Sequence, residues 1–459
     1  MEKFFKLKKY GTNVSTEVLA GLTTFFAMSY ILIVNPDILS ATGMPWGGVY
    51  IATILASAVG TLIMGLYANV PYAVAPGMGL NTFFAFTVSA QLGFSWQESL
   101  AIVFLCGLIN ILITVTNVRK KIIAAIPESL QYAIGGGIGI FVAYLGFING
   151  GILINGNESS ALVPALATFN NPGVALTLIG LLITIVLVVN NVKGAVLLGI
   201  VATSIIGIPL GVTQVDADSS ISLSEAFTGF SETAGAIFTS AGFPSLFTGG
   251  WQKIIIAIVT IFSFSLSDVF DTIGTFIGTG RTSGIFSDAE IEKMQSTTGF
   301  KTRLDKAMVA DSVATSIGAV FGTSNRTTYV ESTAGIGAGG RTGLTSVITS
   351  IMFIVAIFFS PIVSLVPSQP TAPALIIVGI MMMSNFAKIN WSDLEDAVPA
   401  FFASVFMGLS YSITYGIAFG FISFIIVKLA KKKWKDINSV MVISVLLFAL
   451  YFAIMAIQA

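Results

Sequence analysis

Apolar runs long enough to cross a lipid bilayer follow one another along almost the entire chain. A helix that crosses the hydrocarbon core needs about 20 mostly apolar residues. Of the 459 residues, 55% are hydrophobic and 10% are charged, whereas about a quarter of the residues in a soluble domain are charged. The sequence therefore predicts an all-α polytopic membrane protein.

The apolar runs form two groups of seven, separated by a polar stretch at 211–250. A last apolar run at 440–457 is compatible with an extra span, a hairpin or an interfacial helix. The fourteen expected spans cover residues 18–34, 46–67, 72–90, 100–116, 130–147, 173–189 and 194–210, then 254–277, 308–321, 327–340, 344–363, 372–386, 400–413 and 415–429. Because seven is odd, the two groups enter the membrane from opposite sides.

The basic residues predict the orientation of these spans, because Lys and Arg favour the cytoplasmic side of short loops. With a cytoplasmic amino terminus, 20 of the 22 basic residues fall on that side, and the exceptions are Lys253 and Arg326. The stretch at 211–250 then lies outside and contains no Lys or Arg. Its carboxylates are Asp216, Asp218, Glu225 and Glu232. We therefore expect a multi-pass protein of the cell membrane with its amino terminus inside.

Two pairs of short motifs suggest that the second group of spans repeats the first. VAPGMG at 74–79 is similar to STAGIG at 332–337, and IPES at 126–129 is similar to VPSQ at 366–369. Inverted repeats with discontinuous helices at the membrane midplane are frequent in transporters. Glycine-rich motifs also recur for close helix packing, which is the alternative explanation. Agreement of both motif positions with the charge pattern favours two inverted repeats of seven segments.

The third span of each group contains a polar or glycine-rich break, at 71–81 and 321–340. Irregular backbone survives at membrane depth only where it is buried in protein or lines a cavity. In the second break, Glu331 precedes a short glycine-rich helix, for which Ser332 or Thr333 is the expected N-cap. In the first break, Asn81 presents an amide that serves either a ligand or a neighbouring helix.

Four carboxylates fall inside expected spans, where each costs several kcal/mol and is therefore a functional candidate. Asp268 and Asp271 are three residues apart and should share one helix face, followed by Thr275. Two carboxylates so close do not both ionise easily, so the pair can hold a proton or brace neighbouring helices. Asp311 lies close to Lys306, and a structural ion pair is expected there.

The remaining composition argues against several classes of function. The formal net charge is zero, which gives no basic excess for nucleic acid. The chain has no histidine, the most common metal ligand, and we expect neither a metal nor a resident cofactor. Acidic groups beside two half-helix ends suit a small, planar, polar solute with several hydrogen-bond donors. The residues alone do not name that solute.

The motifs APGMGLN at 75–81, SDVFDTIGT at 267–275 and GTSNRTTYVESTAGIGAGGRTG at 322–343, with TTFFAMSYILIVNP at 23–36, carry a family resemblance. The chain resembles the nucleobase–cation symporters related to nucleobase–ascorbate transporters, in the azaguanine-like branch of hypoxanthine, guanine and adenine permeases. The resemblance implies short strands in spans three and ten. It divides the chain into a core domain (1–118 and 251–364), a gate domain (119–211 and 365–436), an extracellular loop (212–250) and a carboxyl-terminal hydrophobic helix (437–459).

The resemblance also implies a function and a site. Proton-coupled uptake of a purine base would proceed by alternating access, with a homodimer as the usual assembly. One of Asp268, Asp271 and Glu331 would carry the proton. The candidate substrate-binding residues are Asp271, Glu331, Asn81, Gly79, Asp268, Thr275, Val330 and Ser332. Relatives that transport uracil or xanthine place an acid or a histidine where this chain has Thr275.

Two other functions stay open at this point. An anion transporter of the same architecture would need a basic residue at the half-helix ends, for which Arg326 is the candidate. An intramembrane aspartyl enzyme would need two aspartates on different spans that face each other. The position of Asp268 and Asp271 on a single expected helix argues against such an enzyme.

Overall fold

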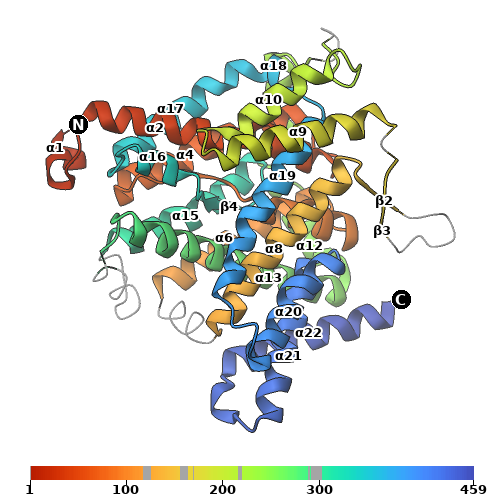
Figure 1. Ribbon diagram of the computed structural model, residues 1–459. Coiled ribbons are helices and arrows are strands. Elements are labelled where there is room, and N and C mark those ends of the chain that lie inside the picture. The colour runs from red at the N-terminus through yellow and green to blue at the C-terminus, as the bar shows by residue number, and fades with distance from the viewer. Residues whose placement is uncertain are drawn as a thin grey trace.

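The computed structural model describes residues 2–116, 126–155, 164–168, 170–215, 220–287, 290 and 302–458. Within these residues the protein is almost entirely helical (Figure 1). Nine of the described helices are long and apolar enough to cross a membrane. Several charges used for the sequence prediction lie outside the described residues: Arg119, Lys120, Lys121, Asp216, Asp218, Lys293 and Lys301.

Each expected span contains at least one helix. The longer helices are α2 Val14–Met28, α3 Ile31–Ser40, α4 Trp46–Ile63, α6 Trp96–Val115, α8 Glu128–Asn149, α9 Pro172–Val189, α10 Ala195–Gly207, α13 Gly250–Thr282, α15 Arg303–Phe321, α17 Gly343–Ala356, α19 Ser368–Met382, α20 Leu394–Leu409, α21 Ile413–Ala430 and α22 Ser439–Gln458. The first expected span differs from its prediction, because the chain turns at Ser29 and Tyr30 and divides it into α2 and α3. The count of fourteen spans and the inverted repeat remain predictions.

The two broken spans meet in a short antiparallel sheet deep in the protein. Strands β1 Val74–Pro76 and β4 Arg326–Thr328 pair with Ala75 opposite Thr327, and every residue of both strands is buried. Each strand leads into a short helix, α5 Met78–Thr82 or α16 Ser332–Gly337. The pairing supplies backbone partners at a depth where water supplies none. The two strands implied by the family resemblance are therefore present.

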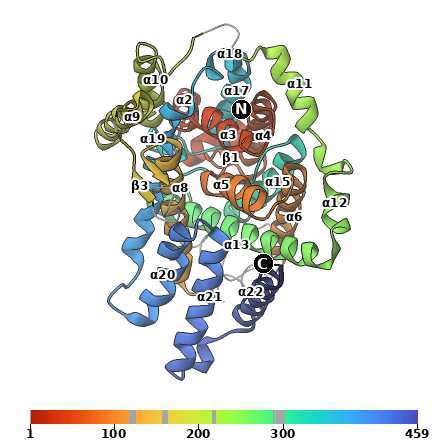
Figure 2. The same cartoon turned by 90° about the vertical axis from the view of Figure 1, so that its right-hand side faces the viewer.

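The polar stretch at 211–250 is folded against the spans. It contains α11 Leu223–Thr233 and α12 Phe243–Thr248, which lie along one edge of the molecule in Figure 2. A Cβ atom at Gly48 of α4 would lie 2.4 Å from the carbonyl oxygen of Gly229. This backbone approach holds α11 closely against α4.

The two basic residues that do not follow the charge rule are both engaged inside the protein. Lys253 pairs with Glu98 at 2.5 Å, and Glu98 also accepts a hydrogen bond from Ser245 at the start of α12. Arg326 in β4 is fully buried. Both cations are therefore accommodated by contacts within the protein, which explains why they need not lie on the cytoplasmic side.

The carboxyl-terminal run forms α22, which packs on two other helices (Figure 2). The ring of Phe448 lies 6.1 Å from that of Phe262 in α13 and 6.2 Å from that of Phe421 in α21. Tyr451 lies 6.2 Å from Tyr415 of α21. The run is thus a helix that packs on the rest of the protein. Whether it crosses the membrane, and in which direction, stays a prediction.

Candidate functional site

Glu331 occupies the N-cap position of α16, where the chain leaves the β1–β4 sheet. Free backbone N–H groups and the positive end of the helix dipole favour a carboxylate there. Oε1 of Glu331 accepts a hydrogen bond of 2.5 Å from the hydroxyl of Tyr30. The predicted cap was wrong, because Ser332 is already the first helical residue and its hydroxyl accepts from the backbone N–H of Ala73 at 3.0 Å.

Tyr30 is a site residue that the sequence prediction missed. Its side chain is 1% exposed and lies at the turn between α2 and α3. The residue falls in the stretch 23–36 that already carried part of the family resemblance. A buried tyrosine needs a partner for its hydroxyl, and this requirement was the available signal.

Asp271 approaches the same region from α13. Its Oδ2 accepts a hydrogen bond of 3.1 Å from the hydroxyl of Thr327 in β4. Asp271 and Glu331 are both partly accessible, and Val330 next to Glu331 is 45% exposed. The structure therefore brings an accessible carboxylate from α13 and another from α16 to the two ends of one short segment, 327–331.

Asp268 is bonded to a different neighbour from Asp271. Its Oδ2 accepts 2.6 Å from the side-chain amide of Asn110 in α6, and that amide oxygen accepts from Ser265. Asp268 is 1% exposed, and its Oδ1 has no hydrogen-bond partner among the described residues. The expected common face thus separates into an accessible acid, Asp271, and a buried acid in contact with α6.

Asp311 is the largest correction to the sequence prediction. Its two oxygens accept hydrogen bonds from Thr272 of α13 at 2.8 Å and from Thr328 of β4 at 2.7 Å. Lys306, its expected partner, instead places its ammonium 5.5 Å from the centre of the Tyr67 ring. Five residues along a helix turn about 140° around its axis, so Lys306 and Asp311 point to different sides of α15.

The first broken span contributes mainly to packing. Asn81 is fully buried, and its Nδ2 donates 2.9 Å to Asn35 of α3. Its Oδ1 has no partner among the described residues. A Cβ at Gly79 would lie 2.0 Å from Cγ2 of Ile138 in α8, so α5 touches that helix directly. Asn81 therefore connects helices, and a role in ligand binding stays a prediction.

Other candidates also lie in packed surroundings. Thr275 is 5% exposed in α13. The ring of Phe83, which follows α5, lies 4.5 Å from the ring of Phe264. Phe84 is fully buried. Direct contact of Thr275 with the substrate stays a prediction.

Arg326 is directed away from the accessible carboxylates. Its guanidinium donates to the hydroxyl of Ser57 at 2.9 Å and to the carbonyl of Thr53 at 3.3 Å, both in α4. Successive side chains of a strand point to opposite faces, which separates Arg326 from Thr327. The cation that an anion site would need is therefore occupied elsewhere.

Comparisons with known proteins show the family of this chain. The model of the Permease family matches residues 15–419. The chain belongs to this family. Guanine/hypoxanthine permease PbuO of Bacillus subtilis is 42% identical over 448 residues, which cover 97% of this chain and 98% of the relative. Adenine permease AdeP of Escherichia coli is 37% identical over 450 residues, which cover 98% and 95% of the two chains.

Solved structures show the same fold at low sequence identity. The transmembrane domain of the cyanobacterial bicarbonate transporter BicA superimposes with a TM-score of 0.62 at 16% identity, over 88% of this chain and 97% of that domain. SLC26A9 gives a TM-score of 0.59 at 12% identity, over 93% and 66% of the two chains. The match to the Permease family and the relatives named as permeases make this chain a polytopic membrane transporter and not an enzyme, which removes the aspartyl enzyme from consideration.

The carboxyl end of α16 in this permease is held by a cation. The guanidinium of Arg341 donates 2.7 Å to the carbonyls of Ile336 and Gly340. Glu331 at one end of α16 and Arg341 at the other both match the helix dipole. The short helix that presents Glu331 is therefore stabilised electrostatically at both ends.

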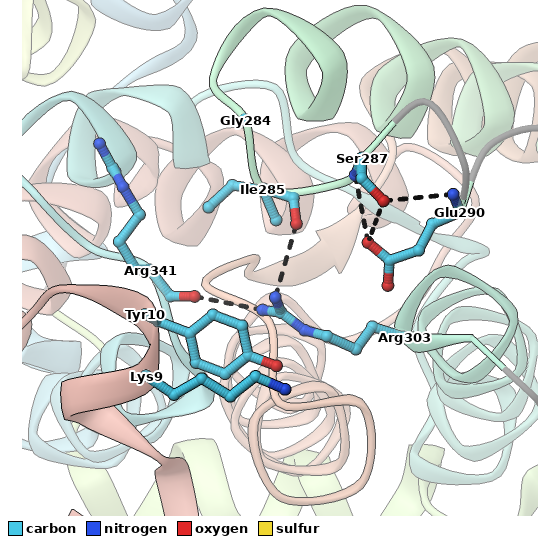
Figure 3. Close-up of a pocket in the computed structure, with 8 residues that line it drawn as sticks. All are labelled: Lys9, Tyr10, Gly284, Ile285, Ser287, Glu290, Arg303 and Arg341. Carbon is cyan, nitrogen blue, oxygen red and sulfur yellow. Dashed lines mark hydrogen bonds between the residues drawn. The ribbon is translucent and has the colours of Figure 1, made fainter.

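Arg341 also lines a pocket of about 440 Å³ with Lys9 and Arg303 (Figure 3). The guanidinium of Arg303 lies 4.3 Å from the Tyr10 ring centre and donates 2.6 Å to the carbonyl of Asn69. It also donates to the carbonyl of Arg341 at 3.2 Å. This junction ties the amino-terminal segment to the loop after α16.

The permease shows no group of three or more His, Cys, Asp or Glu side chains arranged to hold a metal ion among its described residues. The acids of the site instead accept hydrogen bonds from hydroxyls and amides. The expectation that no metal or cofactor is needed stays a prediction.

Proposed function

We propose that this permease imports purine bases, such as hypoxanthine, guanine or adenine, across the cytoplasmic membrane together with protons. The observation that carries the proposal is the accessible pair Asp271 and Glu331 at the β4–α16 junction. Each of these carboxylates has one hydroxyl donor in the structure, from Thr327 or Tyr30. The relatives named as guanine/hypoxanthine and adenine permeases support this class of substrate.

The chemistry of a purine edge fits two such carboxylates. An ionised carboxylate accepts up to about four hydrogen bonds, so each acid retains acceptor capacity. A purine base offers ring N–H groups and, in guanine and adenine, an exocyclic amino group as donors. Two-point pairing would select a base with donors on two edges, and a hydrogen bond to a charged group contributes about 1.5–3 kcal/mol.

Transport would follow from movement of the core domain relative to the gate domain. In this proposal the chain has fourteen segments in two inverted repeats, with a cytoplasmic amino terminus. The contact between Gly79 of α5 and Ile138 of α8 would lie at the boundary between core and gate. A homodimer remains the assembly that the family resemblance implies.

One of Asp268, Asp271 and Glu331 is proposed to take up the coupling proton. All three are held inside the protein by hydroxyl or amide donors. In a low-dielectric region, neighbouring carboxylates favour a shared proton over two ionised groups. An inward proton gradient would therefore favour protonation of this carboxylate from the outside of the membrane.

The test is uptake of radiolabelled hypoxanthine, guanine and adenine into proteoliposomes, with and without an imposed inward proton gradient. We expect accumulation of at least one base, abolished by a protonophore and by either Asp271→Asn or Glu331→Gln. Glu232→Gln on exposed α11 is the matched control and should transport normally. Accumulation that persists in both site variants would sink the site assignment, and accumulation driven only by sodium would sink proton coupling.

A further inference from the structure

The proposed function places two demands on Asp271. As a ligand for purine N–H groups it should be ionised, but as the entry point for the coupling proton it should be protonated. One carboxylate does not satisfy both demands at once. A second proton-holding group in contact with Asp271 would remove the conflict.

We propose that Thr272 and Thr327 form a proton relay that connects the accessible Asp271 with the buried Asp311. This inference rests on the proposed proton-coupled function and assigns to Asp311 the role of holding the proton while Asp271 binds the base. Asp311 is 2% exposed. The relay would therefore carry the proton inward from the partly accessible carboxylate.

Two hydrogen bonds and one longer hydroxyl contact form a path between the two acids. The hydroxyl of Thr327 in β4 lies 3.1 Å from Oδ2 of Asp271. The hydroxyls of Thr327 and Thr272 lie 3.4 Å apart, and either of them can donate. Thr272 in α13 lies 2.8 Å from Oδ2 of Asp311. Three contacts and two hydroxyl groups thus bridge the acids.

The transfer leaves both threonines chemically unchanged. A protonated Asp271 donates to Oγ1 of Thr327, whose own hydroxyl hydrogen passes to Oγ1 of Thr272. The hydroxyl hydrogen of Thr272 passes in turn to Oδ2 of Asp311. One O–H bond breaks and one forms at each threonine, and the net result is one proton moved from Asp271 to Asp311. Asp271 is then an ionised acceptor, and Thr327 donates to it.

The surroundings of Asp311 suit a group that holds a proton. Asp311 interacts electrostatically with two carboxylates of α13, Asp268 and Asp271. Three carboxylates in a buried region repel one another, and protonation of one of them relieves that repulsion. Glu331 also interacts electrostatically with Asp271, and the guanidinium of Arg326 is directed to α4. Oδ1 of Asp311 keeps its bond from Thr328 in either state.

The central contact also provides a gate. Hydroxyl–hydroxyl hydrogen bonds normally measure about 2.7–2.8 Å, so the 3.4 Å contact must shorten before a proton passes. That contact joins α13 to β4. A shift of the strand relative to α13, as expected when the base binds next to Thr327, would open or close the relay.

The test separates movement of the base from movement of the proton. Wild-type and variant proteins are reconstituted in proteoliposomes, with whichever purine base the wild type accumulates. Equilibrium exchange of labelled base at equal pH measures binding and alternating access, whereas accumulation driven by an inward proton gradient also requires coupling. A pH-sensitive dye inside the vesicles reports the proton influx that accompanies the base.

We expect Thr272→Val to lower proton-driven accumulation by at least about tenfold, while exchange falls much less. Thr272→Ser keeps a hydroxyl at this position and should restore accumulation. Thr260→Val is the control, because Thr260 is buried in the same helix but donates only to the carbonyl of Ile256. Wild-type accumulation in Thr272→Val, or equal loss of exchange and accumulation in both Thr272 variants, would overturn the relay.

A second variant keeps the proposal testable if Thr272→Val does not fold. Asp311→Asn retains acceptor and donor atoms for Thr272 and Thr328, but its amide neither takes up nor releases a proton at neutral pH. We expect exchange without base-coupled proton influx, and normal proton influx in this variant would reject Asp311. A wild-type protein that moves no purine, or moves it without protons, would refute the proposed function itself. Wild-type coupling with normal accumulation in Thr272→Val refutes the relay alone.

Discussion

The two broken spans share a backbone plan, a short strand followed by a short helix, but their side chains have different surroundings. Gly79 is the second residue of α5 and Gly337 the last residue of α16, and each is the final glycine of its motif, at 74–79 or 332–337. A Cβ at Gly79 would lie 2.0 Å from Ile138, whereas a Cβ at Gly337 meets nothing within 4 Å. The polar residue of the first span, Asn81, is fully buried, and that of the second, Glu331, is partly accessible.

This difference shows how a repeated backbone can carry an asymmetric site. The short helix of the first broken span, α5, is packed against α8, so its residues make contacts between helices. The second half-helix has an open face and a carboxylate at its dipole's positive end, which suits ligand binding. The following predictions test whether the asymmetry is functional.

Glu331→Gln should have the largest effect on transport. Loss of a charged acceptor should reduce purine uptake by up to about 100-fold, because a hydrogen bond to a charged group contributes about 1.5–3 kcal/mol. The measurement is initial uptake at equal amounts of reconstituted protein. Adding Asn81→Asp should not rescue it, since Asn81 lies inside the α3–α5 contact. Rescue by that second change would show that the two halves are interchangeable.

Gly79→Ala and Gly337→Ala form a matched pair. Overpacking against Ile138 should lower the free energy of unfolding by about 1–3 kcal/mol for Gly79→Ala. Gly337→Ala should leave stability unchanged or raise it, because alanine favours a helix over glycine by up to about 1 kcal/mol. Thermal unfolding in detergent measures both, and Ile138→Ala should relieve the clash in the double variant. Equal destabilisation by both glycine variants would contradict the asymmetry.

Tyr30→Phe should weaken base binding by about tenfold, because the hydroxyl that orients Glu331 is lost and the hydrogen bond contributes about 1.5 kcal/mol. The affinity of the purified protein for the transported base is the measurement. Tyr50→Phe is the control, because Tyr50 also buries its hydroxyl but donates it to the carbonyl of Ala356. The same loss of affinity in both variants would indicate a packing effect.

Asn81→Ala should have the smallest effect on transport. Its bond to Asn35 is worth about 1 kcal/mol of folding free energy, and uptake per folded molecule should change little. Thermal unfolding and binding affinity, measured on the same preparation, separate the two contributions. Affinity that falls as much as in Glu331→Gln would place Asn81 in the binding site.

Local sequence pattern was sufficient to locate most of the helices and the two breaks. The glycines after Glu331 predicted a short helix and the family resemblance predicted a strand before it, and both are present. The predicted N-cap was wrong by one residue or two, because Glu331 itself takes that position. The turn at Ser29 and Tyr30 was also missed, since this stretch is as apolar as an unbroken span.

The candidate site was only partly predictable because hydrogen-bond partners are chosen between distant segments. Tyr30 and Glu331 are 301 positions apart, and Asn110 and Asp268 are 158 apart. Helical spacing placed Asp268 and Asp271 near each other on α13 but did not show that their partners lie on different elements. Proximity along α15 likewise suggested Lys306 for Asp311, whereas the rotation of the helix separates them.

The sequence by itself determined the class of protein, since so many apolar runs are stable only in lipid. It also determined where that pattern breaks, and which acids lie inside the spans. Only the tertiary structure decided which of these acids remain accessible and which are connected through Thr272 and Thr327. The physical reason is that apolar pattern and helical spacing are local properties, whereas burial and hydrogen bonding depend on how distant segments pack.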